Sequence, residues 1–329
     1  MLGFEEILGD LVCPRGKAQG AIESLALVDG RLRSSRRSYP VIDGVPDLRM
    51  DEMGDTSYGV IHSQREVERR LEAVEDRMPA LVESLDMRPD EINGARVLLA
   101  GAGGGVELAL LSRFDPELIV AVDYSAYVRV LRASSGLFHP RTVFLQGDLC
   151  NLPFQEDSFD YVINSGVMHH TRSPELAFRN LHGVLRTGGT IVMGHIYAPN
   201  DHNRRITVAR NRFGFHLMDS QAARDILAGQ ARRYTRACRW GLLKYLKRYP
   251  RLFGMKVELS GRNLTGYEQN MTSACDYYLC EYRHTITPEE VCSWYDHVGM
   301  TVERTAKGFR GRKPRSLEPT EPAAQGFSG

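Results

Sequence analysis

The sequence predicts an α/β fold built on a doubly wound, mostly parallel sheet. Two observations favour it: short apolar runs alternate with helical segments between residues 96 and 200, and glycines follow the first run. Residues 97–100 are typical of a buried parallel strand, and residues 106–112 are typical of a helix. The alternation of strand and helix then places helices on both faces of the sheet.

Glycines occupy alternate positions between this first strand and its helix, at Gly101, Gly103 and Gly105. Because glycine has no Cβ, a ligand can approach the backbone closely at such a turn, next to a helix N-terminus. The dinucleotide-binding fingerprint has its third glycine where this chain has Val106. The glycine turn alone is therefore a weak signal, and its value depends on the segments that follow.

Four further segments follow at regular distances along the chain. A strand over residues 119–122 ends in Asp123, and an acidic side chain there can accept both hydroxyls of a ribose. Residues 143–145 lead to a Gly-Asp-Leu turn at 147–149, and residues 161–164 lead to the segment Ser-Gly-Val-Met-His-His-Thr at 165–171. A fifth strand is expected at residues 190–194.

Together these five motifs resemble those of the class I S-adenosylmethionine-dependent methyltransferases, of the type 11-like group, over roughly residues 92–200. The resemblance implies a Rossmann-like, seven-stranded sheet, S-adenosyl-L-methionine as cofactor and S-adenosyl-L-homocysteine as product. It implies that Asp148 accepts a hydrogen bond from the adenine amino group and that the Leu149 amide meets the ring. The cofactor-binding residues that we expect are Ala100, Gly101, Ala102, Gly103, Gly105, Asp123, Tyr124, Asp148, Leu149, Asn164 and Ser165.

Leu99 departs from the family pattern, which usually has Asp or Glu at this place to help hold the methionine amino group. One interpretation is that backbone carbonyls around Gly101 take over this contact. The other is an altered ligand pose, weakened cofactor binding, or a reaction that is not plain methyl transfer.

Residues 1–50 are expected to form a small β-rich module. They resemble the zinc-ribbon-like domain of methyltransferase activator subunits, whose zinc-binding members carry two Cys-x-x-Cys pairs. Here only Cys13 remains, with Gly16 at its partner's place and Ser34 and Arg37 near the other pair. One thiolate cannot close a tetrahedral zinc site, so we expect a metal-free module.

Residues 51–95 are expected to link this module to the methyltransferase domain through lid helices. Apolar residues at helical spacing predict a helix over residues 63–85, which Pro79 kinks or divides. Tyr58 and His62 precede it and are candidates to line the substrate site. The alternative is a helix packed on the sheet with both side chains exposed.

The methyltransferase domain is expected to span residues 96–313, with a helical insert at residues 201–270. Between residues 201 and 256, fourteen Lys and Arg residues stand against three Asp residues. Such a surface attracts anions, although arginines on solvated faces are equally common. We expect the insert to cover the acceptor, with an anionic group bound within one cluster: Arg204, Arg205, Arg210 and Arg212.

The end of the domain returns to the family pattern. Thr287, Pro288 and Glu290 predict a capped helix that runs to about residue 297. Strands are expected at residues 300–305 and 308–313, the second of them antiparallel. Residues 314–329 are expected to be a disordered tail.

Candidate catalytic residues follow the fourth and fifth strands, at the sheet edge where ligands bind in open α/β folds. Methyl transfer mainly requires positioning, and an oxygen or nitrogen acceptor can also need a base. His170 matches a histidine common in the family, which suggests a structural role. The catalytic candidates are therefore His169, His195 and Tyr197.

Composition sets the remaining expectations. The chain has 329 residues, 42% hydrophobic and 25% charged, with a net charge of +1. We find no apolar run long enough to span a bilayer, no opening signal segment and no Cys-x-x-Cys pair, so we expect a cytoplasmic protein with reduced thiols. Homodimer formation stays open.

Three functions are compatible with these patterns. The first is methyl transfer to an O, N or C atom of a small, anionic metabolite or biosynthetic intermediate. The second is RNA modification through the basic insert, which we rank below a small-molecule acceptor. The third, suggested by Leu99, is an S-adenosylmethionine-binding enzyme with a different reaction.

Overall fold

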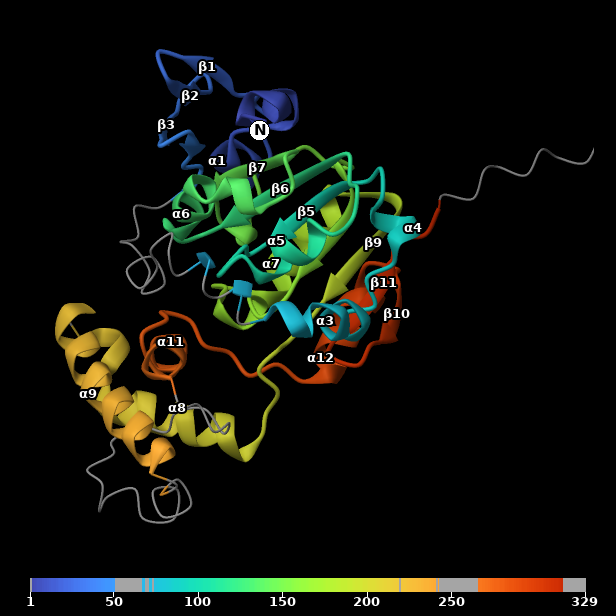
Figure 1. Cartoon of the computed structure of the whole chain (residues 1–329). Coiled ribbons are helices and arrows are strands. Elements are labelled where there is room, and N and C mark those ends of the chain that lie inside the picture. Colours follow the sequence, from blue (N-terminus) through green and yellow to red (C-terminus); the bar gives the residue numbers. More distant parts are fainter. Residues whose placement is uncertain are drawn as a thin grey trace, which may run out of the picture.

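The computed structural model describes residues 2–50, 67–68, 71–72, 74–218, 220–240, 242 and 266–315. Its centre is a seven-stranded sheet with the order β7-β6-β5-β8-β9-β11-β10 (Figure 1). Strands β5 to β9 pair in parallel, and β11 pairs antiparallel with both β9 and β10. The predicted seven-stranded, mostly parallel sheet is confirmed. Its strands are β5 (Arg96–Ala100), β6 (Leu118–Asp123), β7 (Thr142–Gln146), β8 (Phe159–Asn164), β9 (Leu185–Met193), β10 (Thr301–Arg304) and β11 (Phe309–Arg312).

Alternate side chains of each strand enter two different apolar layers. In β5, Val97 and Leu99 join one buried cluster, whereas Leu98 and Ala100 join the other, as the two-residue period of a strand requires. The first layer is covered by α3 (Met78–Ser84), α4 (Pro89–Ile92), α5 (Val106–Leu111) and α6 (Tyr127–Ala133). The second is covered by α7 (Pro174–Val184), α12 (Pro288–His297) and the N-terminal module.

Most element boundaries match the sequence-based expectations, and one differs clearly. The fifth strand, expected at residues 190–194, already begins at Leu185, directly after α7 ends at Val184. Leu185 pairs in parallel with Phe159 of β8, and further along β9 Lys313 donates its backbone N–H to Gly189 O (2.9 Å). Thr287 and Glu290 form the predicted capping box at the start of α12.

The N-terminal module comprises η1 (Phe4–Asp10), α1 (Pro14–Ala18) and a four-stranded antiparallel sheet. Its strands are β1 (Ala26–Val28), β2 (Arg31–Arg33), β3 (Ser38–Ile42) and β4 (Val45–Pro46). The module is bonded to the large domain: Leu48 N–H donates to Gln146 O on β7 (2.8 Å), and Lys17 Nζ donates to Phe154 O (2.6 Å). It therefore covers the β7 edge of the large sheet.

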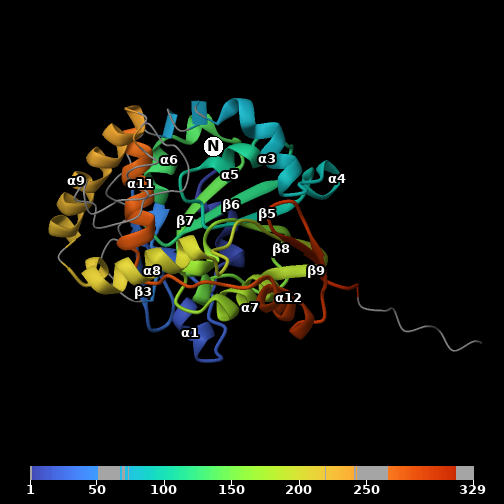
Figure 2. The same ribbon diagram turned by 90° about the horizontal axis from the view of Figure 1, so that it is seen from below.

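The insert after β9 is a separate helical layer with its own apolar core. It contains α8 (Asp201–Phe213), η6 (Phe215–Leu217), α9 (Ser220–Arg239) and α11 (Tyr267–Tyr278). Figures 1 and 2 both show α11 between α9 and the sheet domain. The remaining short 3-10 helices are η2 (Glu75–Arg77), η3 (Ser135–Leu137), η4 (Leu149–Asn151) and η5 (Met168–His170).

Several expectations lie outside the described residues. They include Tyr58 and His62, the insert residues 243–265 and the tail from residue 316. Of the expected lid helix, residues 67–68 and 71–72 are helical, and α3 begins at Met78 with Pro79 in its first turn.

Candidate functional site

The glycine turn between β5 and α5 has a backbone that only glycine adopts readily. Gly101, Gly103 and Gly105 have φ angles of +91°, +46° and +82°. A Cβ on Gly101 would lie 2.3 Å from a methyl carbon of Val167, so no larger residue fits there. A Cβ on Gly103 would meet no heavy atom within 4 Å. The turn is thus packed on one side and has room for a ligand on the other.

Asp123 ends β6 beside this turn and organises it. Its Oδ2 accepts the Gly103 N–H (2.7 Å), and its Oδ1 accepts the N–H and hydroxyl of Ser125 (2.8 and 2.9 Å). Burial raises the pKa of Asp123, while these donors act in the opposite direction. The expected ribose-binding carboxylate therefore lies directly against the glycine turn.

Tyr124 follows Asp123, and Arg49 of the N-terminal module contacts its ring. The Arg49 guanidinium lies 5.3 Å from the centre of the Tyr124 ring and pairs with Asp47 (2.7 Å). Gln146 Nε2 also donates to the Tyr124 carbonyl (3.0 Å). The module thus contributes to the surroundings of the expected adenosine-binding residues.

Asp148 and Leu149 follow β7, at the neighbouring strand end. Asp148 caps η4 by accepting the Cys150 N–H at Oδ1 (2.8 Å), and Arg172 lies 3.9 Å from its Oδ2. The Asp148 side chain is about one-fifth exposed, whereas Leu149 is buried. Asp148 therefore keeps an oxygen at the surface beside the strand end.

Asn164 and Ser165 end β8, the strand next to β5. The buried Asn164 amide donates to Ala100 O (2.6 Å), and a Cβ on Gly194 would lie 2.5 Å from Ser165 Oγ. The Asn164 amide thereby links the ends of β8 and β5, and Ser165 lies close to Gly194, just after β9. Asn164 thus supports the residue that precedes the glycine turn. Within the turn, Ala102 is fully buried.

Leu99 is fully buried in the apolar layer under α5. Its neighbours in the sheet are Ala121 on β6 and Ile163 on β8. An acidic side chain at this place would be surrounded by hydrocarbon, and ionisation there is costly. The local packing therefore suits leucine.

His169 lies at the centre of an aromatic cluster at the ends of β8 and β9. Its ring stacks on Tyr197 with centres 3.7 Å apart and meets the His170 ring at 4.3 Å. The described part of the chain offers its Nδ1 no hydrogen-bond partner. Burial, together with the neighbouring His170, lowers the pKa of His169 well below its ordinary value. The imidazole is therefore neutral near pH 7.

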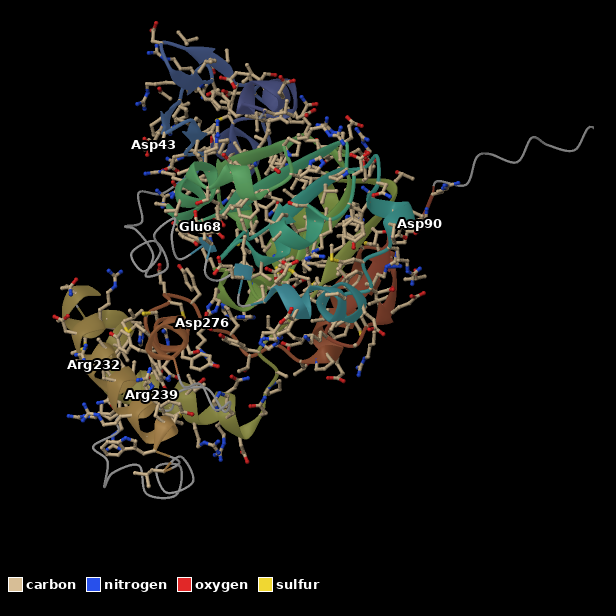
Figure 3. All side chains as sticks on the ribbon, viewed as in Figure 1. Asp43, Glu68, Asp90, Arg232, Arg239 and Asp276 are labelled. Atoms are coloured by element: carbon tan, nitrogen blue, oxygen red, sulfur yellow. The ribbon has the colours of Figure 1, made fainter. Side chains whose placement is uncertain are left out.

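His170 has the opposite charge state because α11 supplies Asp276 beside it. His170 Nε2 lies 3.0 Å from Asp276 Oδ1, and its Nδ1 lies 3.1 Å from Tyr282 O. Burial disfavours the charged ring, but the Asp276 carboxylate outweighs it and raises the pKa of His170 to about 10. Asp276 also accepts a short hydrogen bond from the Tyr197 hydroxyl. Figure 3 shows Asp276 on α11, facing the sheet domain.

The other two catalytic candidates differ in their accessibility. Tyr197 is buried between His169 and the insert. His195 is exposed, and its ring centre lies 6.1 Å from that of His169. The structure thus brings all three candidates together, with only His195 on the surface.

The four arginines expected to bind the acceptor do not share one environment. Arg204 is exposed and pairs with Asp201 (3.3 Å), Arg205 is exposed, and Arg212 lies over the Phe213 ring. Arg210 is buried, and its guanidinium donates to Tyr278 O (3.2 Å) and Glu281 O (2.7 Å). These bonds tie α8 to the end of α11, which is a structural position.

Sequence reasoning missed two charged residues of this cluster, Asp276 and Arg283. Arg283 lies 4.6 Å from the centre of the Tyr197 ring. Neither residue stands in a family motif: Asp276 lies on α11, at the end of the insert, and Arg283 lies in the segment that follows it. A search for polar residues at the end of the insert and just after it could have found them.

The positions that correspond to the zinc ligands of the activator family, Cys13 and Gly16 among them, contain a hydrogen-bonded thiol. Cys13 Sγ lies 3.2 Å from the Tyr39 hydroxyl and accepts the Gly16 N–H (3.4 Å). These bonds and one from Ser34 outweigh burial and lower the pKa of Cys13. Among the residues that the structure describes, we find no group of three His, Cys, Asp or Glu side chains that could hold a metal.

Comparison with known proteins identifies the central part of the chain. Residues 98–193 match a family described as a methyltransferase domain. The chain is 30% identical over 120 residues to 2-methyl-6-phytyl-1,4-hydroquinone methyltransferase 2, chloroplastic, of Oryza sativa subsp. japonica, covering 33% of each. It is 29% identical over 115 residues to tRNA U34 carboxymethyltransferase of Syntrophotalea carbinolica, covering 33% of this chain and 35% of that protein. The chain thus spans about a third of the length of these relatives.

One solved structure shows a weaker, longer similarity. It is a complex of the Haloferax volcanii Trm112 methyltransferase activator with a methyltransferase. The alignment covers 77% of this chain and 97% of that one, with 13% identity and a TM-score of 0.44. Separately, none of the helices within the described ranges is long and apolar enough to cross a bilayer.

Proposed function

Because residues 98–193 form a class I S-adenosylmethionine-dependent methyltransferase domain, we propose that the whole chain transfers a methyl group to a small, anionic acceptor. The observation that carries the proposal is the contact between Val167 and Gly101. It holds the segment that bears His169 against the glycine turn. The cofactor side and the proton-accepting side therefore adjoin at one edge of the sheet.

The residues at this edge fit S-adenosylmethionine. Gly103 leaves open space where a Cβ would stand, and Asp123, which accepts the Gly103 N–H, would meet the ribose hydroxyls. Tyr124 would cover the adenine, and Asp148 would accept from its amino group. When bound, the cofactor supplies an electrophilic methyl group on a sulfonium.

His169 supports acceptors that must lose a proton before or during methylation. Its neutral, buried imidazole has an unpartnered Nδ1 within the described region. Tyr197 fixes the ring by stacking, and the Tyr197 hydroxyl is in turn fixed by Asp276. We assign His169 as the general base, a role that contributes about 10²–10⁴-fold in enzymes.

The relative from rice is named for a hydroquinone acceptor, and a hydroquinone has acidic hydroxyls. Hydroquinones and phenols are therefore the first acceptors to test, with methyl-labelled S-adenosylmethionine. The proposal predicts label in the small-molecule product with the native protein and much less with Asp123→Ala. Absence of cofactor binding by the native protein would contradict the function itself.

RNA modification is the second candidate, favoured by the exposed arginines of the insert. Arg232, Arg233 and Arg236 are exposed on α9, and Figure 3 places Arg232 and Arg239 on that helix. One relative is named for a tRNA substrate. The same assay with unmodified tRNA separates the candidates: label in tRNA, with binding that falls steeply as salt rises, would favour this second function.

A further inference from the structure

Arg283 lies in the segment between α11 and α12, where it joins the insert to the aromatic cluster. Its NH1 donates to Thr207 Oγ1 (3.0 Å) and its NH2 donates to Asn203 Oδ1 (2.7 Å), both on α8. Its guanidinium lies 4.6 Å from the centre of the Tyr197 ring and 5.9 Å from that of Tyr277. Two neutral side chains and two rings thus hold this cation in place.

The charge of Arg283 is not balanced locally. Within the described ranges, no Asp or Glu lies within ion-pair distance of its guanidinium, and its Nε is shielded from water without a hydrogen-bond partner. The neighbouring cations differ: His170 pairs with Asp276, and the buried Arg210 donates to two backbone carbonyls. Arg283 is partly exposed, and a cation with no carboxylate beside it favours the binding of an anion.

Arg283 lies in the same cluster as His169, the proposed general base. Arg283 is close enough to His169 that its charge lowers the pKa of that imidazole, and both lie against Tyr197. Thr207 and Asn203 each accept one N–H, so the second hydrogens of both amino groups have no acceptor among the described residues. A planar guanidinium with free N–H groups is well suited to an oxyanion.

We propose that the Arg283 guanidinium binds an oxyanion of the acceptor, a phenolate or a carboxylate, next to His169. This inference rests on the proposed function, since it assigns the acceptor side of the same site. The proton of an acceptor hydroxyl passes to His169 Nδ1, and the negative oxygen that results is held by Arg283. The acceptor class is therefore an aromatic compound with an acidic hydroxyl or a carboxylate, in place of an anion bound by the exposed arginines.

The test uses 4-nitrophenol, because its phenolate absorbs visible light and the phenol does not. The full-length protein is first saturated with S-adenosylhomocysteine, whose binding is measured by calorimetry. 4-Nitrophenol is then titrated at a pH where it is mostly protonated. We expect the native protein to bind the probe and increase its ionised fraction.

Variants separate recognition from folding. Arg283→Met should weaken probe binding by about tenfold or more, as expected for loss of a hydrogen bond to a charged group, while S-adenosylhomocysteine still binds. Arg283→Lys keeps the positive charge but loses the two parallel N–H donors of the guanidinium, so this variant should bind 4-nitrophenol with intermediate affinity. Arg236→Met removes an exposed cation from α9 and should change probe binding less than twofold.

Competition with benzoate shows whether the site binds carboxylates as well as phenolates. Displacement of 4-nitrophenolate by benzoate would extend the site to carboxylates, and probe binding that resists benzoate would restrict it to phenolates; either supports an oxyanion at Arg283. Equal probe binding by Arg283→Met and native protein would overturn the inference. So would failure of the native protein to bind the probe while it binds S-adenosylhomocysteine. Failure of the native protein to bind S-adenosylhomocysteine would instead contradict the proposed function itself.

Discussion

The cofactor side and the acceptor side of this protein are built in different ways. On the cofactor side, each expected contact comes from a short segment directly after one strand: the glycine turn after β5, Asp123 after β6 and Asp148 after β7. On the acceptor side, His169, Tyr197 and Arg283 come from three segments, and the helical insert separates the last from the other two. Local motifs therefore define one side, and packing between distant segments defines the other.

This difference affects how each side responds to change. The glycine turn is held by backbone geometry and by Asp123, all within the sheet domain. The acceptor cluster instead depends on α8 and α11, which hold Arg283, His170 and Tyr197 in place. Substitutions on one side should leave the other almost unaffected.

The largest expected effect comes from the base. His169→Gln keeps a polar side chain of similar size but cannot accept a proton, so methyl transfer to a hydroxylated acceptor should fall by about 10²–10⁴-fold. S-Adenosylmethionine affinity should stay within about twofold. Single-turnover kinetics and calorimetry measure the two quantities, and His297→Gln, an exposed histidine on α12, is the matched control. An unchanged rate of methyl transfer would show that His169 is not the general base.

The second effect belongs to the cofactor side. Asp123→Ala should weaken S-adenosylmethionine binding by about 1.5–3 kcal/mol, because a charged hydrogen-bond acceptor is lost. Calorimetric titration measures it, with Asp90→Ala, an exposed acid in α4, as control. If the affinity is retained, Asp123 serves only to orient Gly103, and the ribose is held elsewhere.

The third effect is a pH dependence of stability that belongs to the acceptor side. The folded state raises the pKa of His170 from 6.5 to about 10, so it holds that proton more tightly than the unfolded chain does. The stabilisation from the pair with Asp276 is complete below about pH 6.5 and declines as the pH rises toward 10. The difference in unfolding free energy between native protein and His170→Gln should shrink over this interval. A constant difference in denaturant titrations would contradict the ion pair.

The smallest effect is expected for the exposed arginines of α8. Arg204→Ala, Arg205→Ala and Arg212→Ala should each change the acceptor KM by less than about twofold, since exposed charges contribute little. Steady-state kinetics with each variant provide the comparison with Arg283→Met. A tenfold rise in the acceptor KM would instead indicate that the arginine cluster predicted from the sequence binds the acceptor.

Sequence was informative where function depends on consecutive residues. The first five strands of the large sheet and the position of Asp123 followed from patterns that span a few residues each, because hydrophobic period and glycine conformation are local properties. Asp276 and Arg283 could not be predicted in this way: their roles arise only when α11 folds back onto His170 and α8 meets the following segment. Arg210 shows the converse, since its place in a basic cluster concealed a buried structural role.

The most direct test of the account is a crystal structure of the protein with S-adenosylhomocysteine and 4-nitrophenolate bound together. The account predicts the ribose hydroxyls on the Asp123 carboxylate, the sulfur facing the His169 ring, and the phenolate oxygen within hydrogen-bond distance of the Arg283 guanidinium. A phenolate bound on the outer surface of the insert, or a sulfur that faces away from His169, would contradict it.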